Sequence, residues 1–346
     1  MFLMNIIFMG TPDFAVPTLD GIINSAHKII AVVTQPDRPK GRGREILPSP
    51  VKLAVSEANL VVAEANKIDV LQPEKVREKD FIEKLKKYKP DCIVVVAFGQ
   101  ILPKEILNLP RYGCINLHAS LLPKYRGAAP INWALIKGET KTGVTSMFMD
   151  EGMDTGDILI QREVEIGEND NAGALHDRLS KIGGDVILET LDGLEKRTIK
   201  RIKQDSSIAT YAPKLKKEDC LIEWSIGAKE IVHRIRGLTH APGAYTSYNG
   251  KRLKITEADY KIQDSRFKIQ DLKLATCNLQ LAACKNGEIF EVNRNGIKVI
   301  CGNGLVIIKN LQLEGKRVMG VGEFISGHNI KAGEILGGMN ESAGEN

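Results

Sequence analysis

The stretch Asn116-Leu117-His118-Ala119-Ser120-Leu121-Leu122-Pro123-Lys124-Tyr125-Arg126-Gly127, followed by Asp150-Glu151-Gly152-Met153-Asp154-Thr155-Gly156, is the most informative part of this sequence. Residues two apart in a strand point to the same face, so Asn116 and His118 project together if Cys114 to His118 ends a strand. Asp154 lies in a second glycine-bounded segment that can fold back onto them. An amide, an imidazole and a carboxylate around one point can stabilise a developing oxyanion and move a proton. Asn116, His118 and Asp154 are therefore the expected catalytic residues, although a lone N-x-H pattern is more often structural.

Short apolar runs outside this stretch predict a buried parallel sheet. The runs are Asn5–Met9, Lys28–Thr34 and Asp91–Ala97, and helical patterns lie between them, notably from Asp80 to Tyr88. Strands that alternate with helices predict βαβ units, whose parallel sheet is covered on both faces. An amphipathic helix from Ala172 to Leu194 closes this first domain. Sheets of this kind bind ligands at the carboxyl ends of their strands.

The C-terminal part of the chain changes to short strands separated by tight turns. Asn249-Gly250 is a strong hairpin signal, and several short strands with such turns suggest a small β-barrel. Lys261-Ile262-Gln263-Asp264 recurs as Lys268-Ile269-Gln270-Asp271, a short duplication typical of an insertion in a hairpin loop. The expected strands are Tyr245–Tyr248, Arg252–Ala258, Ile289–Val292, Gly296–Cys301 and Leu305–Leu313, and the expected helix is Ile226–Ile235.

The segment from Gln35 to Lys52 differs from the rest because it combines basic residues with four prolines and two glycines. It shows neither a helical nor a strand period, so we expect a long exposed loop. A flexible basic loop beside the ligand-binding edge of a sheet can hold phosphates, whereas the alternative is a disordered surface loop. Its candidate contacts are Arg38, Lys40, Arg42 and Arg44.

Composition limits the class of protein. Residues 1–200 hold 26 Lys and Arg against 27 Asp and Glu, whereas residues 201–346 hold 22 against 16, a balance of +6. A basic C-terminal part suggests a polyanionic partner, and a surface that is basic by chance is the alternative. The six cysteines form no C-x-x-C pair, so we expect a reduced cytoplasmic chain without disulfide, zinc or other metal. No apolar run is long enough for a membrane span, and no signal peptide is indicated.

The quoted stretch resembles the signature of the 10-formyltetrahydrofolate-dependent formyltransferases: N-x-H, then S-L-L-P-x-Y-R-G, then D-x-G-x-D-T-G. Within that superfamily the chain is most similar to the members that act on methionyl-tRNA, through Phe8 to Ala15, Gln35 to Pro39 and Tyr211 to Lys214. The resemblance implies a Rossmann-like α/β domain with a parallel-rich sheet and a smaller OB-like β-barrel domain. The expected boundaries are a catalytic domain at 1–203, a linker at 204–212, a tRNA-binding domain at 213–337 and a flexible tail at 338–346.

The resemblance also implies a reaction, namely transfer of the formyl group of 10-formyltetrahydrofolate to the α-amine of methionine on initiator tRNA. His118 and the Asn116 amide would stabilise the oxyanion, and Asp154 would pair with His118 or relay the amine proton to the folate nitrogen. Ser120, Leu121, Leu122 and Pro123 would form part of the folate pocket, with the leucines as an apolar wall, although both leucines would otherwise suit an ordinary core.

The tRNA partner would contact the basic loop and the basic barrel. The expected product of the folate donor is tetrahydrofolate, and no metal is expected. The protein itself is expected to be a monomer that does not bind a membrane. Two alternatives stay open. One is a formyltransferase for a small acceptor, such as a nucleotide sugar or glycinamide ribonucleotide. The other is an RNA-binding protein without activity. The basic regions disfavour the first, and the intact Asn116, His118 and Asp154 disfavour the second.

Overall fold

The computed structural model describes residues 3–40, 45–60, 67–262 and 285–337 of the chain. The chain divides into two compact units. The first comprises residues 1–130, 141–165 and 174–213, and the second comprises residues 131–140, 166–173 and 214–346. The second unit therefore includes two short segments from the N-terminal half of the sequence, and no local sequence pattern predicts this.

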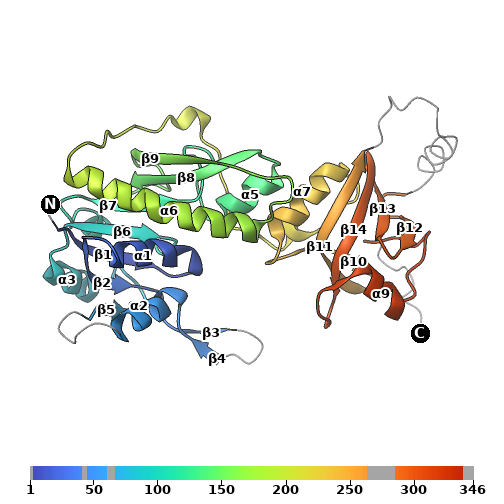
Figure 1. Ribbon diagram of the computed structural model, residues 1–346, viewed down its shortest axis with the longest axis horizontal. Helices are drawn as coiled ribbons and strands as arrows, with labels where there is room; N and C mark the ends of the chain where they lie inside the picture. Colours follow the sequence, from blue (N-terminus) through green and yellow to red (C-terminus); the bar gives the residue numbers. More distant parts are fainter. Residues whose placement is uncertain (1–2, 41–44, 61–66, 263–284, 338–346) are drawn as a thin grey trace. The chain divides into compact units, whose positions relative to one another are not determined.

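A seven-stranded sheet in the order β5-β2-β1-β6-β7-β8-β9 forms the centre of the first unit (Figure 1). The first five strands of this order pair in parallel, and β8 and β9 extend the edge antiparallel. This arrangement confirms the expected α/β fold with a parallel-rich sheet. The strands are β1 (Asn5–Gly10), β2 (Lys28–Val33), β5 (Asp69–Leu71), β6 (Cys92–Val96), β7 (Cys114–His118), β8 (Lys141–Phe148) and β9 (Ile158–Glu165).

Helices cover both faces of this sheet, because its apolar strands are buried on both sides. On one face α6 packs Gly183 against Leu117 of β7, and Gly184 of the same helix lies against the carbonyl of Pro17 in α1 (Figure 1). On the other face Leu85 of α3 joins the core that contains Cys114. The helices of this unit are η1 (Asp13–Ala15), α1 (Val16–Ile23), α2 (Pro50–Leu60), α3 (Lys79–Tyr88), α4 (Lys104–Leu107), α6 (Ala172–Glu195) and η3 (Ser206–Ile208).

The basic segment after β2 is not the irregular loop that its composition predicts. It forms a two-stranded antiparallel ribbon of β3 (Arg38–Lys40) and β4 (Glu45–Leu47), and its last residues, from Pro50, already belong to α2. The expectation failed because strand pairing here is short and exposed, so it leaves no alternation of apolar and polar residues. Residues 41–44, which follow β3 in the sequence, lie outside the described residues.

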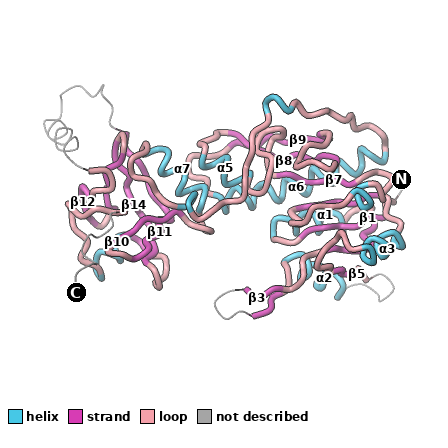
Figure 2. The backbone as a smooth tube through the Cα atoms, turned by 180° about the vertical axis from the view of Figure 1, so that it is seen from behind, coloured by secondary structure: helices cyan, strands magenta, loops and turns pink. Residues whose placement is uncertain are grey.

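The second unit contains an antiparallel sheet in the order β10-β11-β14-β13-β12, with β15 paired to β14. Figure 2 shows β10, β11, β12 and β14 among its strands. Its apolar face packs on α7, whose Ile231 and Ile235 are fully buried. The expected C-terminal domain of short strands is confirmed, and its strands pair as an antiparallel sheet. The elements are α5 (Pro130–Ile136), η4 (Glu218–Cys220), α7 (Ala228–Leu238), β10 (Ala244–Tyr248), β11 (Lys251–Ile262), β12 (Ile289–Asn293), β13 (Gly296–Cys301), β14 (Gly304–Leu313), β15 (Met319–Gly320) and α9 (Val321–Gly327).

The hairpin signal at Asn249-Gly250 produces the expected turn between β10 and β11, with positive φ angles of 49° and 73° at its two residues. The duplicated segment begins within β11 at Lys261, but its remainder lies in residues 263–284, outside the described part, as does the predicted tail at 338–346. In the described ranges, no helix combines the length and the apolar character that a membrane span requires.

Candidate active site

Strand β7 places Asn116 and His118 on the same face of the first sheet. Leu117 points to the opposite face, where it meets Gly183 of α6. The strand is held by parallel pairing of Asn116 with Val95 and antiparallel pairing of His118 with Thr145. The Asn116 side chain is half-buried and makes no hydrogen bond to any residue that the structure describes. Its amide is thus available as a hydrogen-bond donor beside His118.

Both ring nitrogens of the buried His118 face acceptors. Nε2 lies 2.9 Å from the carbonyl oxygen of Tyr125, and Nδ1 lies 3.7 Å from Oδ2 of Asp154. A neutral imidazole carries a single N–H, so it satisfies only one of these acceptors, whereas the imidazolium satisfies both. Only the contact of Nε2 is within hydrogen-bond distance, which assigns the proton of a neutral ring to Nε2. The structure therefore brings His118 and Asp154 together, and their catalytic role stays a prediction.

Asp154 is fixed on the connection between β8 and β9. Its Oδ2 accepts a 2.7 Å hydrogen bond from the N–H of Gly127, and its main-chain carbonyl accepts one of 2.8 Å from Nε2 of Gln204. Its φ of +54° lies in the left-handed region, which short polar residues such as aspartate tolerate better than most. Side chain and main chain of Asp154 are thus both held, and the carboxylate is aimed at His118.

The expected folate-pocket residues form a tight turn after β7. Leu122 is 3% exposed and packs with Met147 and Ile158, so its side chain belongs to a core cluster. The Ser120 hydroxyl donates to the carbonyl of Lys124, and Leu121 lies over Gly143 of β8.

Neighbouring side chains hold this turn in place. The carbonyl of Leu122 accepts from Gln161, and its N–H donates to Thr145. Of the four expected pocket residues, Leu121 and Pro123 are half-buried and keep part of their surface accessible, whereas Ser120 and Leu122 are buried. The assignment of the turn to the folate pocket stays a prediction.

Of the four basic residues predicted to contact tRNA, the structure describes the side chain of Arg38 alone. Its guanidinium is 58% exposed and forms a 2.5 Å ion pair with Glu74. Lys40 closes β3 opposite Glu45, while Arg42 and Arg44 lie outside the described residues. The base of the ribbon is anchored by Asp37, whose carboxylate accepts from Lys52 at 2.6 Å and from Gln72 at 2.8 Å. These hydrogen bonds hold the pKa of the Asp37 carboxyl below its usual value.

Two residues that the sequence did not single out for this site hold its parts together. Gln204, expected in a linker, is 7% exposed, and Arg126 is 2% exposed. The Gln204 Oε1 accepts from the Arg126 guanidinium at 2.8 and 3.1 Å. Arg126 lies within the quoted motif, but nothing local marks Gln204, because its partner Asp154 lies 50 residues earlier in the sequence.

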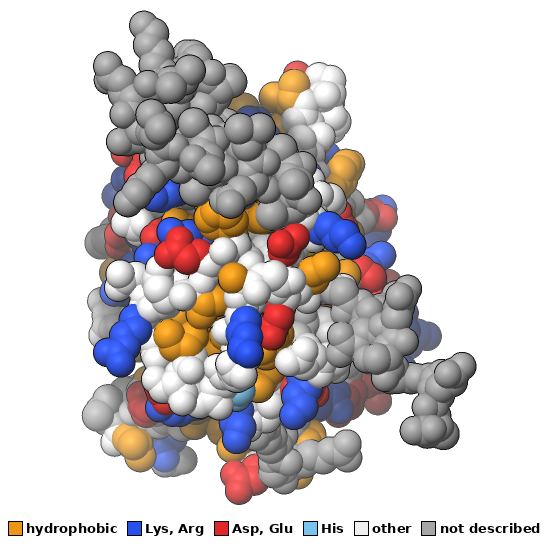
Figure 3. Space-filling view, turned by 90° about the vertical axis from the view of Figure 1, so that its right-hand side faces the viewer, with side chains coloured by type: hydrophobic (Ala, Val, Ile, Leu, Met, Phe, Trp, Pro, Cys, Tyr) orange, Lys and Arg blue, Asp and Glu red, His pale blue; other side chains and the backbone are white. Residues whose placement is uncertain are grey.

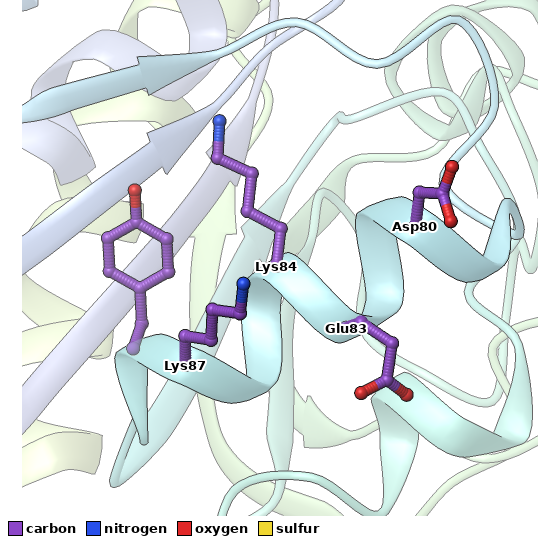
Figure 4. A pocket seen from close by; sticks show the side chains of 5 residues that line it. Asp80, Glu83, Lys84 and Lys87 are labelled. Carbon is purple, nitrogen blue, oxygen red and sulfur yellow. The ribbon is translucent and has the colours of Figure 1, made fainter.

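The cavities are separate from these residues. One of about 550 Å³ lies along α3, where Asp80, Glu83, Lys84 and Lys87 give it balanced charge and no catalytic group (Figure 4). A second, of about 290 Å³, lies in the second unit, and we call it the basic hollow. The described residues that line it include four cations and no carboxylate: Lys216, Lys217, Arg252 and Lys254, together with Leu215, Cys220, Pro242, Gly243 and Tyr245.

The strand that carries Asn116 begins with a cysteine, Cys114. Burial raises the pKa of the Cys114 thiol to about 12, so this cysteine stays neutral although it starts the strand that carries Asn116. No group of three or more His, Cys, Asp or Glu among the described residues is placed to hold a metal ion.

Comparison with known proteins gives a full-length match. The formyl transferase family model matches residues 4–191, and the model for the formyl transferase C-terminal domain matches residues 214–329. A methionyl-tRNA formyltransferase from Citrifermentans bemidjiense is 48% identical over 341 residues, which cover 99% of each chain. One from Geobacter metallireducens is 49% identical over 334 residues, covering 96% of this chain and 99% of the relative.

Solved structures share the fold at lower identity. An N-formyltransferase from Helicobacter canadensis, in complex with folinic acid and dTDP-3-aminofucose, superposes with a TM-score of 0.60 at 19% identity, covering 88% of this chain and 98% of that chain. HypX from Aquifex aeolicus, in complex with tetrahydrofolic acid, superposes with a TM-score of 0.58 at 17% identity over 94% of this chain and 48% of that one. At such identities the likeness concerns the fold.

Proposed function

The chain belongs to the methionyl-tRNA formyltransferase family, and from this premise we propose which of its residues carry the activity. The reaction transfers the formyl group of 10-formyltetrahydrofolate to the α-amine of methionine on initiator tRNA. The neutral amine attacks the formyl carbon, the carbonyl oxygen becomes negatively charged, and the bond from that carbon to N10 of the folate breaks. The nitrogen of the amine loses a proton and the folate nitrogen gains one.

Asn116 and His118 stabilise the oxygen on which charge develops. The Asn116 amide is the donor without a partner among the described residues, and His118 supplies a second N–H from the same strand face. Donors fixed before the reaction act most strongly where charge appears in the transition state. In the structure, Nε2 of His118 is hydrogen-bonded to the Tyr125 carbonyl. This hydrogen bond must break before the N–H at Nε2 can donate to the substrate oxygen.

Asp154 orients His118 and handles the proton. Its Oδ2 faces Nδ1 of the ring at 3.7 Å, and a carboxylate in that position supports a positive charge on the imidazole as the oxyanion forms. The same carboxylate can take the proton that the attacking amine releases and return it to the folate nitrogen through water. No covalent intermediate is required, because two bound substrates need only proximity and oxyanion stabilisation.

The folate donor binds at the turn of Ser120, Leu121, Leu122 and Pro123. Gln161 and Thr145 hold the main chain of this turn, so it presents a fixed edge next to His118. Since the Leu122 side chain is in the core, the half-buried Leu121 and Pro123 provide the apolar contact with the pterin.

RNA binds through basic groups of both units. In the first unit these are Arg38 and Lys40 of β3, together with Arg42 and Arg44, which lie outside the described residues. In the second unit the basic hollow suits a backbone phosphate, because its Lys and Arg side chains surround a concave surface without acidic neighbours in its lining. Figure 3 shows one face of the molecule, on which basic side chains are interspersed with acidic and hydrophobic ones. We also propose that the protein acts as a monomer in the cytoplasm.

The His118–Asp154 pair beside the unpaired Asn116 amide carries this proposal. The test is a formyl-transfer assay with 10-formyltetrahydrofolate that compares Met-charged initiator tRNA, Met-charged elongator tRNA and free methionine. We expect transfer to the charged initiator alone. Transfer to a small amine, with none to any tRNA, would overturn the acceptor and leave the donor chemistry intact.

The basic hollow has a separate test. Lys216→Ala combined with Lys254→Ala should weaken tRNA binding and reduce its salt dependence, since each lost phosphate contact removes about 0.7–0.9 from the slope of log K against log salt. Lys331→Ala, an exposed lysine of the same unit outside the hollow, is the matched control. Equal effects of the two changes would remove the hollow from the RNA site.

A further inference from the structure

Three consecutive residues hold the two members of the catalytic pair. The carbonyl of Tyr125 contacts His118, the N–H of Gly127 donates to the carboxylate of Asp154, and Arg126 between them binds Gln204. Gln204 in turn donates to the carbonyl of Asp154, which closes a ring of contacts. The relative position of His118 and Asp154 therefore depends on one short segment and one distant amide.

The Gln204 amide has a single possible orientation in this ring. The Arg126 guanidinium has only donors, so it must face Oε1, and the carbonyls of Asp154 and Gly156 have only acceptors, so they must face Nε2. A flipped amide would bring donor to donor and acceptor to acceptor. With 7% of Gln204 exposed, water cannot readily replace these partners.

The carbonyls that Gln204 holds define the bend that aims Asp154. The Nε2 group lies 2.8 Å from the carbonyl oxygen of Asp154 and 2.7 Å from that of Gly156. Between these carbonyls the chain turns sharply, with Asp154 at a φ of +54°. Gly156 lies so close to β8 that a Cβ there would stand 1.8 Å from the carbonyl oxygen of Phe148.

The segment that carries Gln204 is itself fixed to the first unit. Ile202 forms a β-bridge with Ile158 of β9, and Arg126 forms one with Tyr211. The main-chain N–H of Arg126 donates to the carbonyl of Thr210 at 2.9 Å. The Arg126 carbonyl accepts from the N–H of Ala212 at 2.7 Å. Residues around Gln204 thus form part of the scaffold of the active site.

We propose that Gln204, oriented by Arg126, is a positioning residue of the formyl-transfer reaction: it sets the main-chain bend that aims the Asp154 carboxylate at His118. It touches neither substrate and acts only through Asp154. This proposal rests on the catalytic role proposed for Asp154.

The test is a double-mutant cycle of Gln204→Met and Asp154→Asn, measured as kcat and KM for charged initiator tRNA and 10-formyltetrahydrofolate. Gln204→Met keeps the length of the side chain and removes its hydrogen bonds. We expect it to lower kcat about 10²-fold with little change in either KM, because a misplacement of about 1 Å at a reacting centre costs that much. In the Asp154→Asn background the same change should cost less than threefold, because the residue through which it acts is already lost.

The pH profile gives a second readout, which a loss of stability alone would not move. The acid limb of kcat/KM should shift in Gln204→Met, since the spacing between His118 and Asp154 changes. Asn59→Leu is the matched control: it removes two hydrogen bonds to the main chain of Ile68 in the same unit and should leave kcat and the profile unchanged. If Gln204→Met does not fold, Gln204→Asn takes its place, because the shorter amide cannot reach Arg126 and both carbonyls.

The outcomes separate the two proposals. Full activity of Asp154→Asn would overturn the catalytic role of Asp154 and this inference with it. An inactive Asp154→Asn combined with a fully active Gln204→Met would overturn the positioning role alone. A rate loss that is equal in both backgrounds would also overturn it, since Gln204 would then act independently of Asp154.

Discussion

Two arginines of the first unit show how the same type of side chain behaves in a buried and in an exposed setting. Arg126 is 2% exposed and divides its guanidinium between Gln204 and Ser206, at 2.8 Å and 3.4 Å for the same nitrogen. Arg38, on the β3–β4 ribbon, is 58% exposed and pairs with Glu74, which is itself 62% exposed. The first is held in one geometry by neutral partners in the interior. The second stays in water, where an ion pair contributes little and exchanges readily.

The difference reflects what each region has to do. Acyl transfer depends on donors and acceptors placed to within a fraction of an ångström before the reaction begins. Contact with a polyanion depends on charge that acts over several ångströms and tolerates variable geometry. The ring of contacts around Asp154 is built on the buried His118, Arg126 and Gln204, whereas the ribbon presents its charge on an exposed antiparallel pair. Variants that affect one region should leave the other intact.

The largest effect should follow from His118→Ala. It removes the ring that faces both Tyr125 and Asp154, and we expect kcat to fall by about 10²–10³-fold, the range seen when an oxyanion donor is lost. The affinity for charged tRNA, measured by a salt-titrated gel shift, should stay within twofold. A comparable loss of tRNA binding would show that the two regions are not independent.

Gly127→Ala should come next, because it strains the segment that holds Asp154. Gly127 has a φ of +121°, and a Cβ there would stand 2.7 Å from the carbonyl oxygen of Ala212. We expect a loss of about 1–3 kcal/mol in the free energy of unfolding, together with a fall in kcat. Denaturant unfolding and the transfer assay measure both.

Gly315→Ala is the control for that substitution. Its φ of +78° is also left-handed, but a Cβ there would meet nothing within 4 Å. It should cost stability through backbone strain alone and leave kcat unchanged. An equal loss of activity in both variants would contradict the specific role of Gly127.

Smaller changes are expected on the ribbon. Arg38→Ala should weaken tRNA binding several-fold and reduce the salt slope by about one contact, whereas Glu74→Gln should strengthen binding because it releases the guanidinium from its ion pair. kcat at saturating tRNA should be unchanged in both. Opposite signs for these two substitutions in a fluorescence binding titration would support Arg38 as a contact, and equal signs would exclude it.

The smallest effect concerns the base of the ribbon at low pH. Hydrogen bonds from Lys52 and Gln72 hold the pKa of Asp37 below its ordinary 3.8 in the folded protein. The stability from these bonds is therefore complete above about pH 3.8 and is lost as the pH falls through the folded-state pKa.

Lys52→Met should raise the pKa of Asp37 toward its ordinary value, which an NMR titration of the carboxyl measures. Asp205 is the internal reference, because hydrogen bonds from Ser207 lower the pKa of that carboxyl and Lys52 has no part in it. A shift of both carboxyls would indicate a general change of the fold instead.

Local sequence determined many of the strands and the longer helices, and it supplied the candidate residues of the site. Apolar runs of five or six residues located β1, β2 and β6, and Asn249-Gly250 located the hairpin between β10 and β11, because burial and left-handed turns restrict residue type directly. The N-x-H spacing placed Asn116 and His118 on one face, since the side-chain period of a strand is two. The resemblance to a family then supplied the reaction.

Tertiary structure alone decided how these parts are fixed. Gln204, expected in a linker, is hydrogen-bonded to Asp154, and α5 belongs to the second unit. The basic segment pairs as β3 and β4, and the side chain of Leu122 is buried. Most of these results depend on partners far away in the sequence: Asp154 lies 50 residues from Gln204, and Gly237 lies 105 residues from Asn132, to which it is hydrogen-bonded. The β3–β4 pair is local, but it is too short and exposed to show a strand period. Residue type and spacing record local burial and backbone preference, whereas a hydrogen bond between distant segments exists only once the chain has folded and leaves no local pattern.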